Sequence, residues 1–137
     1  MNNIIQFVNT HPRNRLIIVP KDFIDVPCID IGKSLSIKLR GVPEESLPNN
    51  AVKFLDEIVD LNLQYSVEFG NYIAIENIGI LLEKDLKIDI KNTLQKYSRD
   101  TALIVKWEGE IEESKLYFLS KEHGVEINLK DITHIIL

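Results

Sequence analysis

This chain of 137 residues has little cysteine and few basic residues for its acidic content. Its single cysteine, Cys28, excludes an internal disulfide and is typical of a reducing compartment. Its 16 Lys and Arg residues are outnumbered by 21 Asp and Glu residues, which leaves a formal net charge of −5. Because nucleic-acid-binding proteins usually present a basic face, we expect no direct binding of nucleic acid.

Long apolar runs, repeats and flexible linkers are also lacking. No run reaches the roughly 18 apolar residues that a membrane helix requires, and residues 1–15 lack the basic start and the cleavage site of a signal peptide. We therefore expect a cytoplasmic protein with no membrane association. Apolar residues make up 45% of the chain and charged residues 27%, which predicts one globular domain spanning residues 1–137.

Apolar runs alternate with amphipathic segments, and this alternation predicts an α/β fold of three layers with a mainly parallel sheet. Buried strands are expected at residues 15–19, 28–31, 71–76 and 102–107, and helices at residues 2–9, 51–62 and 89–97. Residues 33–40 fit both a strand and a helix, and we favour the helix.

Two of the predicted helices have recognisable caps. Asn49 or Asn50 can cap the helix at residues 51–62, and Asp89 can cap the helix at residues 89–97. The apolar side chains of the first of these helices share one face, which we expect to be buried: Val52, Leu55, Ile58, Val59 and Leu63.

The last part of the chain is rich in short strand-like runs. Residues 115–120, 125–129 and 133–137 predict that the sheet finishes with extra or antiparallel strands. The final run is apolar, so it must either pair into the sheet or be covered by a partner. In both cases, truncation of the last residues should be costly.

An acidic residue ends the predicted strand at residues 71–76. Glu76, followed by Asn77, occupies the position where a P-loop NTPase places its Walker B acid, which orients a magnesium ion. The alternative role is structural, because such an acid can cap a backbone group or pair with a Lys or Arg side chain. We favour the structural role, because the phosphate-binding half of such a site is missing.

A phosphate-binding loop follows a strand and has the pattern G-x-x-x-x-G-K-[ST]. After the strand at residues 15–19 the chain has Pro20-Lys21-Asp22-Phe23, which lacks glycine and includes a carboxylate that repels phosphate. Gly32-Lys33-Ser34 matches the end of the motif, but Pro27 stands where the first glycine belongs and has no N–H donor. We therefore interpret Gly32-Lys33-Ser34 as a turn into the following element.

Residues 73–109 contain four short motifs in a fixed order. They are Ile75-Glu76-Asn77-Ile78 with Leu81 and Leu82 after it, Leu86-Lys87-Ile88-Asp89, Ser98-Arg99, and Trp107-Glu108-Gly109-Glu110. In these motifs the chain resembles the small P-loop-containing protein of type 3 BREX (bacteriophage exclusion) systems, a family of bacterial phage-defence components. The resemblance covers about a third of the chain, and residues 15–63 agree only in the order of their elements.

The resemblance implies a P-loop NTPase-like fold in a subunit of a defence complex. The chain departs from the family pattern because the glycine-rich loop is missing after Val19, Glu76 stands where Asp is usual, and Gly79 replaces a later acid. The resemblance therefore implies a shortened relative without nucleotide hydrolysis. Glu76 and Asn77 are then the remnant of a Walker B site.

Two further residues are candidate contacts with a partner protein. Arg99 could act on the phosphate of a partner ATPase, or it could satisfy carbonyl groups at the end of a helix, which we favour. Trp107 could anchor an interface, or it could cover the core at the end of its strand.

No metal or cofactor site is indicated. His11, His123 and His134 lack the spacing of metal ligands. Cys28 has no second cysteine near it and is expected to be a small buried residue.

These observations predict a non-catalytic interaction subunit of a bacterial anti-phage defence complex, which binds no cofactor and docks on a larger ATPase or DNA-modifying partner. Two alternatives stay open. One is a nucleotide-binding ATPase with an atypical site formed by Glu76, Arg99 and Lys33. The other is a phage or mobile-element protein that mimics a defence subunit and inhibits its complex.

Overall fold

The computed structural model describes residues 1–118 and 124–137. Along the chain the elements are α1 (Asn2–Asn9), β1 (Leu16–Pro20), β2 (Ile29–Asp30), α2 (Ile31–Leu39), η1 (Glu44–Ser46), α3 (Leu47–Leu61), β3 (Gln64–Ser66), β4 (Gly70–Glu76), η2 (Ile78–Leu82), η3 (Lys84–Leu86), α4 (Ile90–Tyr97), β5 (Ala102–Trp107), β6 (Glu110–Glu112), β7 (Lys115–Phe118), β8 (Val125–Asn128) and β9 (His134–Ile136). The labels η mark 3₁₀ turns.

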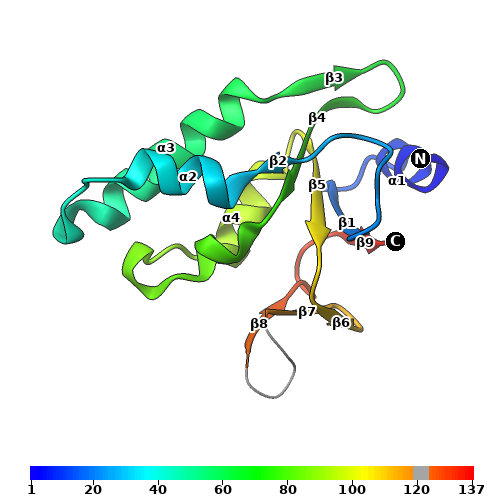
Figure 1. The fold of residues 1–137 in the computed structure, drawn as a ribbon. Coiled ribbons are helices and arrows are strands. Elements are labelled where there is room, and N and C mark those ends of the chain that lie inside the picture. Colours follow the sequence, from blue (N-terminus) through cyan, green and yellow to red (C-terminus); the bar gives the residue numbers. More distant parts are fainter. Residues whose placement is uncertain (119–123) are drawn as a thin grey trace.

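The main sheet is mostly parallel, with the strand order β2-β4-β5-β1-β9 (Figure 1). Only β3 is antiparallel, and it pairs with the first half of β4, on the side where β2 pairs with the second half. Strands β1, β2, β4 and β5 all end at one edge of the sheet, which we call the carboxyl edge. The predicted α/β class with a mainly parallel sheet is therefore confirmed.

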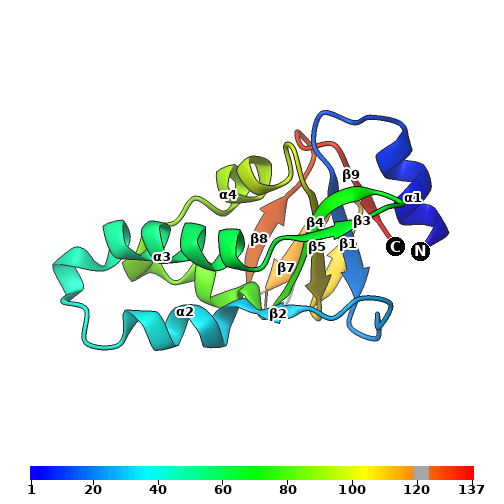
Figure 2. The same cartoon turned by 90° about the horizontal axis from the view of Figure 1, so that it is seen from above.

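Helices cover both faces of the sheet, and each face has its own hydrophobic core (Figure 2). The cluster on one face includes residues of α2, α3 and α4, and the cluster on the other includes residues of α1. Strand β1 belongs to both, because Leu16 and Ile18 face the first cluster while Ile17 and Val19 face the second. All four side chains have 0% exposure, as expected for an interior parallel strand.

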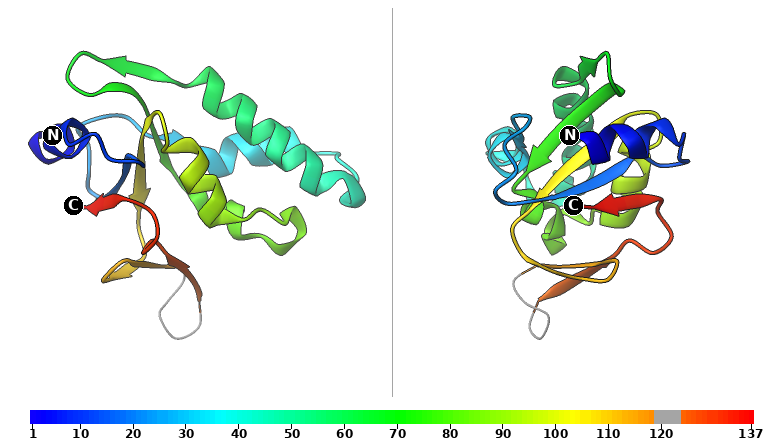
Figure 3. Two further views of the ribbon diagram at one scale, coloured as in Figure 1. Left: turned by 180° about the vertical axis from the view of Figure 1, so that it is seen from behind. Right: turned by 90° about the vertical axis from the view of Figure 1, so that its right-hand side faces the viewer.

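A small antiparallel sheet follows β5, with the strand order β6-β7-β8. The chain then returns to the main sheet as β9, which pairs in parallel with β1 and ends close to helix α1 (Figure 3). The antiparallel strands predicted for the last part of the chain are therefore confirmed for the described residues. Residues 119 and 120 of the first predicted run, and His123, lie outside the described residues.

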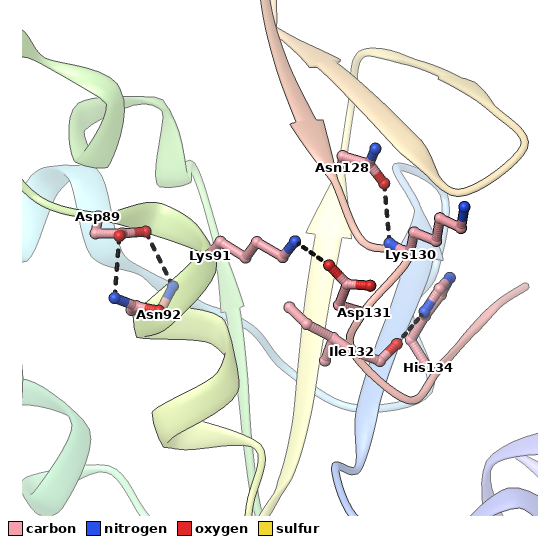
Figure 4. A network of polar contacts seen from close by, with 8 residues as sticks. All are labelled: Asp89, Lys91, Asn92, Asn128, Lys130, Asp131, Ile132 and His134. Atoms are coloured by element: carbon pink, nitrogen blue, oxygen red, sulfur yellow. Dashed lines mark hydrogen bonds and ion pairs between the residues drawn. The ribbon is translucent and has the colours of Figure 1, made fainter.

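The turn before β9 is fixed by polar contacts (Figure 4). Lys91, near the start of α4, forms an ion pair with Asp131 at 2.9 Å. Asn128 accepts a hydrogen bond from the backbone N–H of Lys130 at 2.9 Å. His134 Nδ1 lies 2.6 Å from the carbonyl oxygen of Ile132, so this ring orders the turn into β9.

Helix α3 begins at Leu47, earlier than predicted, and two expectations change with it. Asn49 and Asn50 lie inside the helix and cap nothing at its start, because Pro48 is suited to the first helical turn. Asn50 instead donates a hydrogen bond to the carbonyl oxygen of Ser46 at 2.9 Å.

The buried face of α3 is narrower than predicted. It consists of Ala51, Leu55, Ile58 and Val59. Val52 is 47% exposed because it lies beside this face, and Leu63 is 43% exposed because it follows the end of the helix.

Three other local predictions are confirmed. Residues 31–39 form helix α2, so the helical alternative holds in this region. Asp89 caps α4 and accepts a hydrogen bond from the backbone N–H of Asn92 at 3.1 Å. The last apolar run pairs into the sheet, where the backbone N–H of Leu137 donates to the carbonyl oxygen of Ile18 at 2.9 Å. No helix in the described part of the chain is long and apolar enough to cross a membrane.

Removal of residues 134–137 should lower the free energy of unfolding by more than about 2 kcal/mol, because it uncovers the edge of β1 and removes partly buried isoleucines. The substitution Leu137→Ala is the matched control, since it keeps the backbone bond to Ile18. Urea denaturation followed by circular dichroism measures both. Equal stability of the truncated and intact chains would show that β9 contributes nothing to the sheet.

Candidate functional site

Glu76 lies at the carboxyl edge, where β4 ends. Its carboxylate is 3.8 Å from Nζ of Lys106, and the two side chains are 33% and 15% exposed respectively. Lys106 comes from the neighbouring strand β5. The acid therefore has the basic partner that the structural role requires.

Asn77 joins β4 to the following 3₁₀ turn with a left-handed backbone, at φ 56°. Asparagine adopts this conformation more readily than most residues. Its side-chain Nδ2 donates a hydrogen bond to Oδ1 of Asp30 at 2.8 Å. The residue thus links the end of β4 to the end of β2.

Asp30 is the central acceptor of this edge, and the sequence reasoning above did not single it out. It caps helix α2, where Oδ1 accepts a hydrogen bond from the backbone N–H of Lys33 at 2.9 Å. This bond, together with the bond from Asn77, lowers the pKa of the Asp30 carboxyl. An Asp directly before a helix is a recognised cap signal, but the uncertain assignment of residues 33–40 hid it.

Gly32-Lys33-Ser34 forms the first turn of α2 directly after β2, so the strand-to-helix context of a phosphate loop is present here. A helix N-terminus attracts anions through its free N–H groups and its dipole. In this chain the carboxylate of Asp30 already occupies that position. The resident negative charge repels phosphate.

Gly32 is required by its close contact with Asn77. A Cβ atom at Gly32 would lie 2.3 Å from Nδ2 and 2.9 Å from the carbonyl oxygen of Asn77. Any side chain at this position would push the two segments apart. The glycine therefore serves packing between β2, α2 and β4, which explains it without a phosphate ligand.

The segment after β1 does not form a phosphate cradle. Phe23 and Val26 are each 9% exposed and belong to the hydrophobic cluster around α1. The backbone N–H of Phe23 donates to the carbonyl oxygen of Pro20 at 3.1 Å, which closes a tight turn. The chain reaches β2 without a helix, so this position has no helix dipole to hold phosphate.

The structure separates Arg99 from Glu76. Arg99 is exposed and precedes β5, and the register places Ala102 opposite Tyr72 near the start of β4. Glu76 lies at the other end of that strand. The two side chains therefore cannot share one site within a single chain.

Trp107 lies at the carboxyl edge and is 6% exposed. Its Nε1 donates a hydrogen bond to the carbonyl oxygen of Glu110 at 3.2 Å, and its ring lies 6.5 Å from the ring of Phe118. Of the two roles considered, this geometry matches the cover over the core.

A groove of about 600 Å³ lies beside these residues, between α2 and the 3₁₀ turns. Gly32 and Asn77 line the groove where it meets the carboxyl edge, and Phe118 also lines it. Phe118 packs tightly on Gly79, where a Cβ atom would come within 2.6 Å of the ring. The groove mixes apolar walls with Arg40, Glu83 and Asp85, and it offers no concentrated positive charge to a phosphate group.

A second polar cluster joins α3 to α4. Asp56 accepts hydrogen bonds from the hydroxyl of Tyr97 and, at 2.9 Å, from Nζ of Lys96. Burial and the nearby carboxylate raise the pKa of Tyr97, while the two donors outweigh burial and lower the pKa of Asp56. This cluster lies among helices and serves packing.

Cys28 and the described histidines show no arrangement for metal binding. Across residues 1–118 and 124–137, no group of three His, Cys, Asp or Glu side chains could hold a metal ion. Burial raises the pKa of Cys28, which keeps its thiol protonated and unreactive.

Comparison with protein-family models, curated proteins and solved structures finds no match for this chain.

Replacement of Asp30 by Ala should lower the free energy of unfolding by about 1 kcal/mol, since α2 loses its cap. Asp30→Ser is the matched control, because its hydroxyl oxygen can still cap the helix and should recover most of the loss. Chemical denaturation at pH 7 measures both variants. If Asp30→Ala matches the unaltered chain, the cap has no energetic role.

The contribution of Asp30 should also depend on pH. Its pKa is lowered in the folded chain, so the charged form adds stability that is complete above the ordinary Asp pKa of about 3.9. This stability disappears as the pH falls through the lowered pKa of the folded state. The advantage of the unaltered chain over Asp30→Ser should therefore shrink between pH 5 and 2, on the order of the range set by that pKa. An advantage that does not change with pH would contradict the role of the charge.

Gly32→Ala should destabilise the chain by about 1–3 kcal/mol, because the new methyl group overlaps Asn77. Ser36→Ala, at an exposed position of the same helix, serves as the control and should change stability by less than about 0.5 kcal/mol. Thermal and urea unfolding of both variants test this. A neutral Gly32→Ala would mean that the contact with Asn77 relaxes freely.

Proposed function

We propose that this chain is a non-catalytic interaction subunit, an α/β domain that binds a protein partner and hydrolyses no nucleotide. The observation that carries the proposal is that the chain's own side chains fill both candidate phosphate positions. Phe23 packs into the core after β1, and Asp30 occupies the N-terminus of α2. Glu76, the candidate magnesium-orienting acid, is paired with Lys106.

A P-loop-like ancestry is the finer proposal for the fold. The first strand, β1, lies inside a mainly parallel sheet. Glu76 ends β4, which is separated from β1 by β5 alone. A phosphate loop after β1 and an acid after β4 would therefore share the carboxyl edge, where open α/β sheets bind their ligands. This placement supports an ancestral nucleotide site that has been closed by local side chains.

The proposed setting is a bacterial anti-phage defence complex, with a larger ATPase or DNA-modifying protein as the partner. This part rests on the resemblance of residues 73–109 to the BREX component described above. The geometry adds a reason for a structural role of two resembling residues. Asn77 ties β4 to Asp30, and Trp107 covers the core.

Calorimetric titration of the full chain with Mg-ATP tests the absence of a nucleotide site. We expect no binding tighter than about 1 mM, and the same result for Glu76→Gln, because the carboxylate holds no nucleotide. Micromolar binding that is lost in Glu76→Gln would overturn the proposal in favour of an atypical ATPase.

Purification of the tagged chain from its native host tests the complex. We expect a stable assembly with a larger protein, which mass spectrometry identifies. A chain recovered alone and monomeric would contradict the subunit role. The genes beside its own distinguish a defence component from a phage-encoded mimic, since the former lies in a defence operon and the latter among phage genes.

A further inference from the structure

The β3–β4 hairpin carries an uncovered row of apolar side chains. Leu61, Leu63, Tyr65 and Val67 are 79%, 43%, 71% and 89% exposed respectively, and we call them the hairpin ridge. They lie within a few residues of one another, from the end of α3 through β3 into the turn. The hairpin extends past the end of α3, so no helix covers the ridge (Figure 3).

The hairpin is held rigidly from its other face. Phe69, in the turn, is 5% exposed and belongs to the cluster around α1. Its ring contacts the ring of Tyr72 edge-on, with centroids 5.1 Å apart. A surface that is already ordered loses little conformational entropy when it binds. The ridge is therefore pre-organised for contact.

Strand β3 also offers a free edge to the solvent. In the described sheet it pairs with β4 alone, so the backbone groups on its other side have no strand partner. Proteins usually protect such edges with Lys, Pro or a bulge. Residues 61–70 contain neither Lys nor Pro. An extended peptide can add to an edge of this kind as a further strand.

The charge around the ridge indicates the chemistry of its partner. Residues 54–83 contain no Lys, Arg or His, but they contain Asp56, Glu57, Asp60, Glu68, Glu76 and Glu83. Within the described structure, Asp56, Glu57 and Glu76 form ion pairs with lysines of other elements, whereas Asp60 and Glu68 form none. These two exposed acids flank the ridge in sequence and leave it with an unbalanced negative rim.

We propose that the hairpin ridge and the free edge of β3 bind an extended segment of a partner protein, in which apolar residues alternate and Lys or Arg residues lie at the ends. Its backbone adds to β3, its apolar side chains cover Tyr65 and Val67, and its basic residues meet Asp60 and Glu68. This inference rests on the proposed function, since it names the surface through which the subunit docks.

A second copy of the chain is a poorer occupant. It would bring the same acidic rim against itself, and each chain carries a net charge of −5. Three paired residues on β3 also give a marginal strand contact when side chains add little. A basic segment satisfies both the edge and the charge.

The probe is a fluorescent nine-residue peptide in which Val alternates with Thr between terminal Lys residues. Binding to the full chain is measured by fluorescence anisotropy, and the site is located by amide chemical shifts in nuclear magnetic resonance. We expect shifts at residues 61–68, and at least tenfold weaker binding to Tyr65→Lys and Val67→Lys. Ile24→Lys is the matched control, because Ile24 is 87% exposed on the segment after β1.

Three altered peptides test the mode of binding. A peptide with terminal Glu in place of Lys should not bind, because the rim is acidic. Two peptides methylated on alternate sets of backbone nitrogens should differ. The set that faces β3 should abolish binding, and the set that faces solvent should not. Equal binding of these two peptides would overturn strand addition.

The remaining outcomes also decide the matter. Absence of peptide binding, or shifts confined to the groove between α2 and the 3₁₀ turns, would overturn the assignment of the ridge. Dimers of the chain that Val67→Lys dissociates in sedimentation experiments would assign the ridge to a second copy instead. Neither outcome touches the nucleotide titration or the isolation of a larger complex, so the ridge can fail while the proposed function stands.

Discussion

Complete burial of strand β1 is the constraint on which the rest of the structure depends. Four consecutive side chains, Leu16 to Val19, point alternately to the two faces of the sheet, and each has 0% exposure. Both faces must therefore be covered, by α2, α3 and α4 on one side and by α1 and Phe23 on the other. Both backbone edges must be paired as well, which β5 and β9 accomplish. A chain of this length reaches all four contacts only by returning to β1 with its last residues.

The same constraint closes the edge where a nucleotide would bind. The segment after β1 is used to bury Phe23 and Val26, so it is not free to curl around a phosphate group. Asp30 then caps α2 and accepts from Asn77, which joins two neighbouring strands through one carboxylate. These interactions stabilise the fold with the groups that a phosphate loop would need free. Binding surfaces must consequently lie elsewhere, and the hairpin ridge is the exposed apolar surface that the described chain offers close to an open strand edge.

Much of the main sheet could be predicted from the sequence because burial dictates the pattern. Runs such as residues 102–107 are apolar at successive positions, which is typical of a strand covered on both faces. The cap at Asp89 was equally visible, since an acid before an amphipathic segment satisfies free N–H groups. The start of α3 was not, because Asn49 and Asn50 resemble caps locally, while the turn at residues 44–46 and Pro48 already begin the helix upstream. Val52 was expected in the core because its spacing fits the apolar face, but burial depends on which neighbour packs there.

The candidate site divides in the same way. Sequence by itself determined that no phosphate loop follows β1 and that Glu76 ends a buried strand, because motif spacing and apolar runs are local properties. It could not determine that Lys106 pairs with Glu76, that Asp30 receives Asn77, or that Arg99 lies at the opposite edge. Those facts depend on strand order and register, which bring residues far apart in the chain to one edge and separate others. The exposure of Leu61, Tyr65 and Val67 was likewise decided by tertiary structure, because a side chain is uncovered only when no other element packs over it.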